Sequence, residues 1–208
     1  VTDYRTFRLE DKKPDAVFFH NPYDQTNILT SVHPDFYSSR LRKYADQLVY
    51  LPYYTTASTD NVESVKCQER SADFVTLSAI VNADCIVTAT EQERELFINI
   101  LCSWIKGVQA EQWEEKVQNF GSPKIERVRD TKRQDGSLPE KWQECLYSPD
   151  GSRKKTVFYG LSIEALLNQP DMMKKIEEVL LYFKTRKDLA LWLRPHPLYE
   201  QTLKVMRP

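Results

Sequence analysis

Short apolar runs recur along the whole chain. Each is five to eight residues long, is rich in aliphatic and aromatic side chains, and ends at polar residues or at proline. That pattern is typical of buried strands. The predicted strands cover 15–19, 47–54, 84–89, 155–160 and 189–193, and Pro52 is expected to end the second, because proline is poorly tolerated in a central strand.

Stretches with apolar residues at helical spacing separate these runs. The clearest is 90–107, in which Thr90 and Glu93 can cap the first turn and Gly107 can end the helix. Strands that alternate with helices indicate an α/β protein with largely parallel sheets. Further helices are predicted at 35–45, 71–83, 110–120, 140–147, 171–186 and after Pro197, while 121–128 is expected to be a turn and 129–140 a polar linker.

Composition narrows the class of protein. The 208 residues slightly exceed one typical domain, and 41% are hydrophobic, so the chain can build a packed core. The net charge of −1 argues against a general nucleic-acid binder. No apolar run approaches the ~20 residues that span a bilayer, and the polar start lacks a signal-peptide core. The four cysteines lack zinc-ligand spacing, so we expect no metal and a reducing, cytoplasmic setting.

Candidate chemistry gathers where predicted strands end. His20 directly follows the first strand, His33 lies in the loop beyond it, and His196 follows the last strand. Ligands of open parallel sheets bind beyond these carboxyl ends. All three histidines have a proline within two residues, and proline stiffens the backbone around it.

Arg194 and His196 together suit an anionic oxygen group, phosphate above all. Ser162, in a similar strand-to-helix loop, can bond a phosphate oxygen. The alternatives are structural: a hydrogen-bonded turn for Arg194 and His196, and a strand-end histidine for His20. For His33 the structural role is favoured. The sequence lacks the glycine-rich motifs of dinucleotide-binding proteins and of P-loop enzymes, and it lacks a G-x-S-x-G elbow.

Five segments in order carry a family resemblance: DAVFFHNPYDQTNILTSVHPDFYSSRLRKYADQLVYLPYY, ADCIVTATEQERELF, FGSPKIERV, KKTVFYGLSIEALL and LALWLRPHPLYEQTLKVMRP. They resemble bacterial CDP-glycerol glycerophosphotransferase-like proteins, relatives of the teichoic-acid primases and polymerases. The resemblance implies a GT-B fold with two Rossmann-like domains, 1–120 on the acceptor side and 121–208 opening the donor side. It also implies that each domain is incomplete, since the first strands and an Asp/Ser-rich donor loop are not found.

The resemblance further implies transfer of glycerol phosphate from CDP-glycerol to a hydroxyl acceptor on a lipid-linked or surface glycan, without metal or cofactor. His20 stands where the family has its general base, although Asn21, Pro22 and Tyr23 replace the usual Gly-Thr-Pro. Arg194 and His196 match an Arg-x-His pair that holds the donor's phosphates. Bacterial cell-wall synthesis in the cytoplasm is expected, with peripheral contact at the inner membrane face left open. The alternatives are a GT-B glycosyltransferase with another nucleotide sugar and a non-catalytic binding module.

Overall fold

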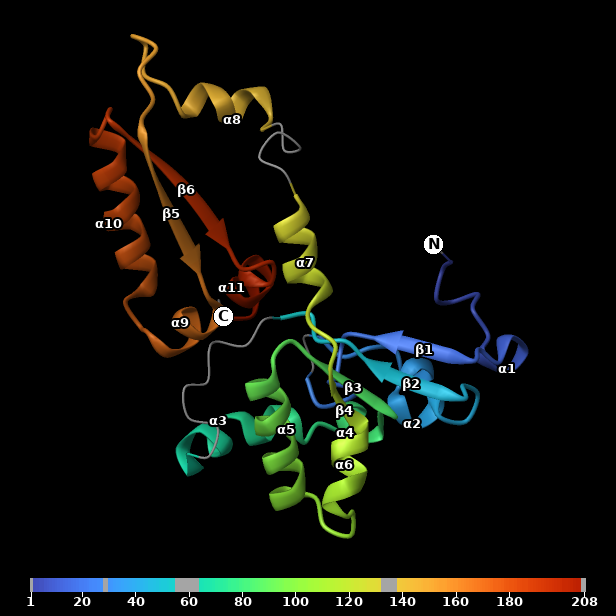
Figure 1. Cartoon of the computed structure of the whole chain (residues 1–208). Coiled ribbons are helices and arrows are strands. Elements are labelled where there is room, and N and C mark those ends of the chain that lie inside the picture. The colour runs from blue at the N-terminus through green and yellow to red at the C-terminus, as the bar shows by residue number, and fades with distance from the viewer. Residues whose placement is uncertain (1, 28–29, 55–63, 132–137, 207–208) are drawn as a thin grey trace. The chain divides into compact units, whose positions relative to one another are not determined.

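The chain is an α/β protein that divides into two compact units, Val1–Thr131 and Lys132–Pro208. The structure is a computed structural model that describes residues 2–27, 30–54, 64–131 and 138–206. Half of the linker predicted at 129–140, residues 132–137, lies outside the described residues. Figure 1 shows the order of the elements along the chain.

A four-stranded, all-parallel sheet forms the first unit. Its strands lie in the order β1 (Ala16–Phe19), β2 (Gln47–Tyr50), β3 (Cys85–Thr88) and β4 (Val117–Asn119). The first three were predicted, and β2 ends before Pro52. The fourth was missed because the predicted helix at 110–120 ran through it, whereas the helix ends at Lys116 and the chain turns straight into the sheet.

Two predicted helices of the first unit differ from the helices in the structure. The single helix expected at 35–45 is a short 3₁₀ turn followed by one helical turn, and the one expected at 71–83 is broken at Thr76. The helices are α1 (Leu9–Lys12), η1 (Pro34–Phe36), α2 (Ser38–Leu41), α3 (Val65–Val75), α4 (Ser78–Asn82), α5 (Glu91–Trp104), α6 (Ala110–Lys116) and α7 (Pro123–Asp130).

Helix α7 lies where a turn was predicted, so that prediction is wrong. The Ser122 hydroxyl accepts the Ile125 N–H, and Pro123 occupies the first turn. Serine as the N-cap followed by proline is a strong helix start, because both reduce the cost of unpaired N–H groups there. Within 121–128, Gly121, with φ of +85°, keeps a conformation that favours glycine.

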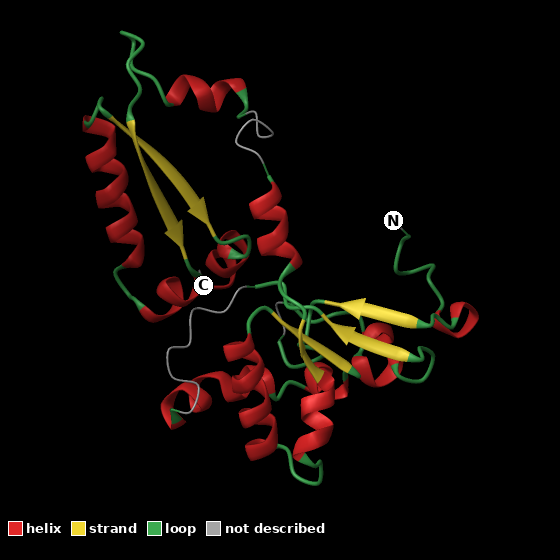
Figure 2. Cartoon of the chain, in the orientation of Figure 1, coloured by secondary structure: helices red, strands yellow, loops and turns green. Residues whose placement is uncertain are grey.

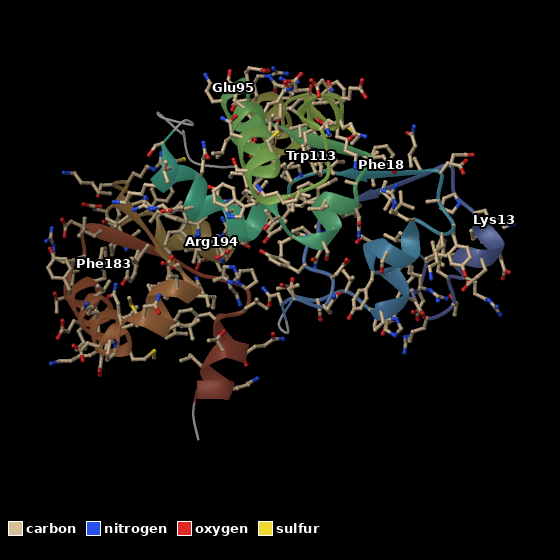
Figure 3. All side chains as sticks on the ribbon, turned by 90° about the horizontal axis from the view of Figure 1, so that it is seen from below. Lys13, Phe18, Glu95, Trp113, Phe183 and Arg194 are labelled. Atoms are coloured by element: carbon tan, nitrogen blue, oxygen red, sulfur yellow. The ribbon has the colours of Figure 1, made fainter. Side chains whose placement is uncertain are left out.

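The central core cluster of the first unit joins three strands of its sheet to several helices. Tyr50, Ile86 and Val117 point from three strands into a cluster with helix residues that include Phe97 and Trp113. Figure 1 shows the helices α4, α5 and α6 on the same side of the sheet, and Figure 3 labels Trp113. Phe18, which points to the opposite face, is 65% exposed, whereas its partner in β2, Val49, is 9% exposed.

A two-stranded parallel sheet forms the centre of the second unit. β5 (Lys155–Leu161) pairs in parallel with β6 (Leu189–Pro195) along its whole length. Both strands were predicted. Figure 2 shows the long α10 beside this pair of strands. The small core of the second unit joins Leu161, Leu166, Met172, Ile176 and Tyr199. The helices are α8 (Glu140–Cys145), α9 (Ile163–Asn168), α10 (Met172–Thr185) and α11 (Tyr199–Met206).

Candidate functional site

The predicted phosphate-binding residues meet at one edge of the β5–β6 sheet. The register places Gly160 beside Arg194 and Leu161 beside Pro195, so the parallel strands end together. Ser162 and His196 are the next residues on the two chains. The carboxyl ends of these strands therefore bring a guanidinium, an imidazole and a hydroxyl to the same edge, and all three side chains are exposed. Figure 3 labels Arg194.

His196 is held at its backbone and at one ring nitrogen. Its N–H donates to the Leu161 carbonyl oxygen at 2.9 Å, which extends the β5–β6 pairing by one residue. Its Nδ1 accepts the Leu198 N–H at 3.2 Å. A neutral imidazole that accepts at Nδ1 carries its proton on Nε2. The exposed Nε2–H is therefore a donor for an anionic oxygen.

Arg194 is the free cation of this edge. Its side chain makes no hydrogen bond or ion pair with any residue that the structure describes, in contrast to Arg186, which pairs with Asp188 at the opposite end of β6 at 2.6 Å. An unpaired guanidinium can engage a phosphate without first leaving a carboxylate.

Ser162 is engaged in a structural role. Its hydroxyl oxygen accepts the Ala165 N–H at 3.1 Å and so caps α9. The hydroxyl hydrogen is still available to donate to a ligand oxygen. The serine can therefore contribute one hydrogen bond to a phosphate while it keeps the helix capped.

His20 lies in the first unit, directly after β1 and at the carboxyl edge of the four-stranded sheet. Its ring is exposed and packs edge-to-face against Tyr53, with centroids 6.2 Å apart. Tyr53 follows β2, the neighbour of β1. The parallel pairing thus brings together two side chains that are 33 positions apart in the sequence.

The loop after His20 is fastened by the polar residues of the segment HNPYD. Asn21 accepts the Tyr23 N–H at 3.0 Å and donates to the Thr30 carbonyl oxygen. Asp24 is 4% exposed and accepts from the Ser38 N–H at 3.0 Å, from the Ser38 hydroxyl at 2.6 Å and from the Ser78 hydroxyl at 3.2 Å. These residues hold the loop in place, and sequence reasoning did not assign them that role.

His33 has a different neighbourhood from His20. Its Nδ1 accepts the Asp35 N–H at 3.3 Å, so it caps η1, and its ring lies 5.4 Å from that of Tyr4. It lines a cavity of about 380 Å³ with residues of the N-terminal segment and Arg40. The arginines there are paired: Arg40 with Glu10 and Asp35, Arg5 with Asp3, and Arg8 with Asp11. A role for His33 as a further site residue stays a prediction, whereas its hydrogen bond to Asp35 has a structural role.

Tyr53 and Tyr54 were not predicted as site residues. Tyr53, the ring partner of His20, is 47% exposed. Tyr53 and Tyr54 line a cavity of about 310 Å³. The available clue was their position, because they follow β2 just as His20 follows β1.

The structure thus gathers Arg194, His196 and Ser162 at one strand edge of the second unit and puts His20 at the strand edge of the first. Within the described ranges, no cluster of three or more His, Cys, Asp or Glu side chains could hold a metal ion. None of the helices described is long and apolar enough to cross a membrane. Comparison with family models, with curated proteins and with solved structures found no match for this chain.

Proposed function

We propose that the chain belongs to a GT-B-type transferase that moves glycerol phosphate from CDP-glycerol to a hydroxyl acceptor and releases CMP. The observation that carries this proposal is the convergence of Arg194, His196 and Ser162 at the carboxyl edge of β5 and β6. Parallel α/β sheets bind their ligands at that edge, and this set of groups is complementary to phosphate.

The donor's phosphates would be held by three kinds of contact. Arg194 supplies a permanent positive charge, the Nε2–H of His196 supplies a directed donor, and the Ser162 hydroxyl supplies a second. Charge builds up on the bridging and non-bridging oxygens as CMP leaves. Fixed donors and a cation at those oxygens stabilise the transition state of such transfers electrostatically.

His20 is proposed as the general base that takes the proton of the acceptor hydroxyl. An exposed imidazole can take the proton of a hydroxyl group that lies within hydrogen-bond reach of one of its nitrogens. Among the described residues, the His20 ring has no hydrogen-bond or carboxylate partner, and it packs against the Tyr53 ring. Both nitrogens are therefore free to engage an acceptor.

Binding of CMP tests the donor side. Isothermal titration with CMP should show binding that weakens by about tenfold or more in Arg194→Gln, since a charge-assisted hydrogen bond contributes about 1.5–3 kcal/mol. His196→Asn should weaken it as well, because asparagine can still accept the Leu198 N–H but lacks Nε2. Arg186→Gln, at the amino end of the same strand, is the matched control and should bind like the unmodified chain.

Three outcomes would contradict the assignment. Equal CMP binding by Arg194→Gln and Arg186→Gln would remove the strand edge as the phosphate site. Absence of CMP binding in the unmodified chain would favour a non-catalytic module. Tighter binding of UDP-glucose than of CDP-glycerol would favour a glycosyltransferase with another nucleotide sugar.

Release of CMP from CDP-glycerol tests His20. Replacement by asparagine should lower the rate by about 10²–10⁴-fold and leave CMP affinity unchanged, because a general base acts on the chemical step. His33→Asn, which can still cap η1, serves as the control. A His20→Asn variant with full turnover would rule out the base role.

A further inference from the structure

Four aromatic rings of the first unit contact one another in a closed circle beside His20. Tyr23 packs on Phe74 with centroids 6.4 Å apart, Phe74 packs on Tyr54 at 4.8 Å, and Tyr54 packs on Tyr53 at 5.5 Å. The hydroxyl oxygens of Tyr53 and Tyr23 lie 3.2 Å apart and close the circle. We call these four residues the aromatic collar.

The collar borders a cavity of about 310 Å³. Val75, Leu96 and Phe97, buried in the core, form its apolar floor. Arg70 and Ser71 of α3 add polar groups to its wall. Apolar walls with a few directed polar groups are the usual composition of a small-molecule site, and this volume lies at the small end of the range.

The hydroxyls of Tyr23 and Tyr54 keep their protons at neutral pH. Burial raises the pKa of Tyr23 to about 12, and the neighbouring Tyr53 adds to the shift. Burial also raises the pKa of Tyr54. The hydroxyl pair of Tyr23 and Tyr53 shares one hydrogen, so the other hydrogen can point to a ligand. Arg70 is exposed, and its guanidinium makes no hydrogen bond or ion pair within the described part of the chain.

The geometry of the collar favours some ligands over others. Its three ring contacts are nearly perpendicular, at interplanar angles of 77°, 88° and 82°. No pair of parallel rings is present among them to enclose a planar base from both sides. A ligand with C–H faces and several hydroxyl groups can instead lie against single ring faces and bond to the hydroxyls and the guanidinium around them.

We propose that the aromatic collar is the binding site for the carbon skeleton of a sugar or polyol, one hydroxyl of which is presented to His20. The edge-to-face contact between His20 and Tyr53 places the imidazole next to the collar. This inference rests on the proposed function, in which that hydroxyl is the acceptor. It adds the residues that hold that acceptor.

Saturation-transfer NMR with methyl β-glucoside, N-acetylglucosamine and glycerol as separate probes tests the collar. At least one probe should receive magnetisation from the unmodified chain. Tyr53→Ala should lower the transfer several-fold, whereas Tyr53→Phe, which keeps the ring, should retain most of it. Tyr4→Ala removes a tyrosine of similar exposure, 53% against 47%, from the neighbourhood of His33 and should change nothing.

Arg70→Gln provides a second variant that leaves the ring contacts intact, and it should also weaken binding. The collar proposal is overturned if none of the three probes binds, or if Tyr53→Ala and Arg70→Gln both bind like the unmodified chain. CMP titration of the same variants separates this result from the proposed function. If the unmodified chain binds CMP but none of the three probes, the collar proposal alone is overturned. If it binds a probe but not CMP, the donor site alone is overturned.

Discussion

At the scale of single residues, the two His-Pro pairs of the chain form the same local turn, so the pair by itself does not indicate a function. His33 and His196 both precede proline, and in both the Nδ1 accepts the N–H two residues further on. His33 caps a short helix among paired arginines. His196 follows a strand beside Arg194, which has no ion-pair partner in the ranges that the structure describes. The candidate role of His196 therefore comes from its place at the strand edge.

Asp24 is the residue whose removal should cost the most in the loop after His20. Its carboxylate accepts three hydrogen bonds while 4% exposed, and its φ of +44° is tolerated by asparagine better than by alanine. We expect Asp24→Ala to lower the free energy of unfolding by about 2–3 kcal/mol. Asp24→Asn should cost less, because it keeps one acceptor oxygen.

Urea denaturation followed by circular dichroism measures both Asp24 variants. Asp35→Ala, an exposed carboxylate in the same segment, is the control and should stay within about 0.5 kcal/mol of the unmodified chain. If Asp24→Ala matched that control, the buried contacts would not stabilise the loop.

At the scale of elements, the capping pattern of α5 was predictable and its details were not. Thr90 Oγ1 accepts the Glu93 N–H at 3.2 Å, as the sequence indicates. The Glu93 carboxylate, 3% exposed, accepts the Ala89 N–H at 2.7 Å, one residue before the expected partner. The helix ends at Trp104, before Gly107, because the chain is already extended at Ile105.

Thr90→Ala should destabilise the first unit by about 1 kcal/mol, since the N–H of Glu93 then loses its acceptor. Thr90→Ser keeps the hydroxyl and should recover most of that loss. Thermal unfolding of the two variants measures the difference. Identical melting of Thr90→Ala and Thr90→Ser would show that the cap contributes nothing.

Elements with their own periodicity were found from sequence, and those that depend on neighbours were not. The helix α10 carries a stripe of apolar residues, and the strands β5 and β6 are apolar runs. β4 has three residues, of which Val117 is buried, and only its pairing with β3 makes it a strand. The turn predicted at 121–128 overlooked a helix start at Ser122 and Pro123 that could have been recognised.

At the scale of the whole molecule, the two units have separate cores. Ile100 belongs to the core of the first unit and is fully buried, while Ile176 belongs to that of the second and is 7% exposed. Ile100→Ala should cost the first unit about 2–5 kcal/mol and leave the unfolding of the second unchanged. Ile176→Ala should do the reverse.

Tryptophan fluorescence can separate these two transitions, because each unit contains two of the four tryptophans. Trp142 and Trp192 pack edge-to-face in the second unit with centroids 5.6 Å apart, so replacing Trp104 and Trp113 by phenylalanine leaves a reporter for that unit. An equal shift of both transitions by Ile100→Ala would show that the units unfold as one.

The sequence by itself determined the α/β class, most of the strands, the long helices and the strand-end positions of His20, Ser162, Arg194 and His196. These features follow from local periodicity, caps and proline, which act over a few residues. Only the tertiary structure decided which strand ends share an edge and that Tyr23, Tyr53, Tyr54 and Phe74 close into a collar. It also decided that Arg194 pairs with none of the described residues, whereas the arginines near His33 are paired. Those facts depend on contacts between residues far apart in the chain, and no local pattern encodes them.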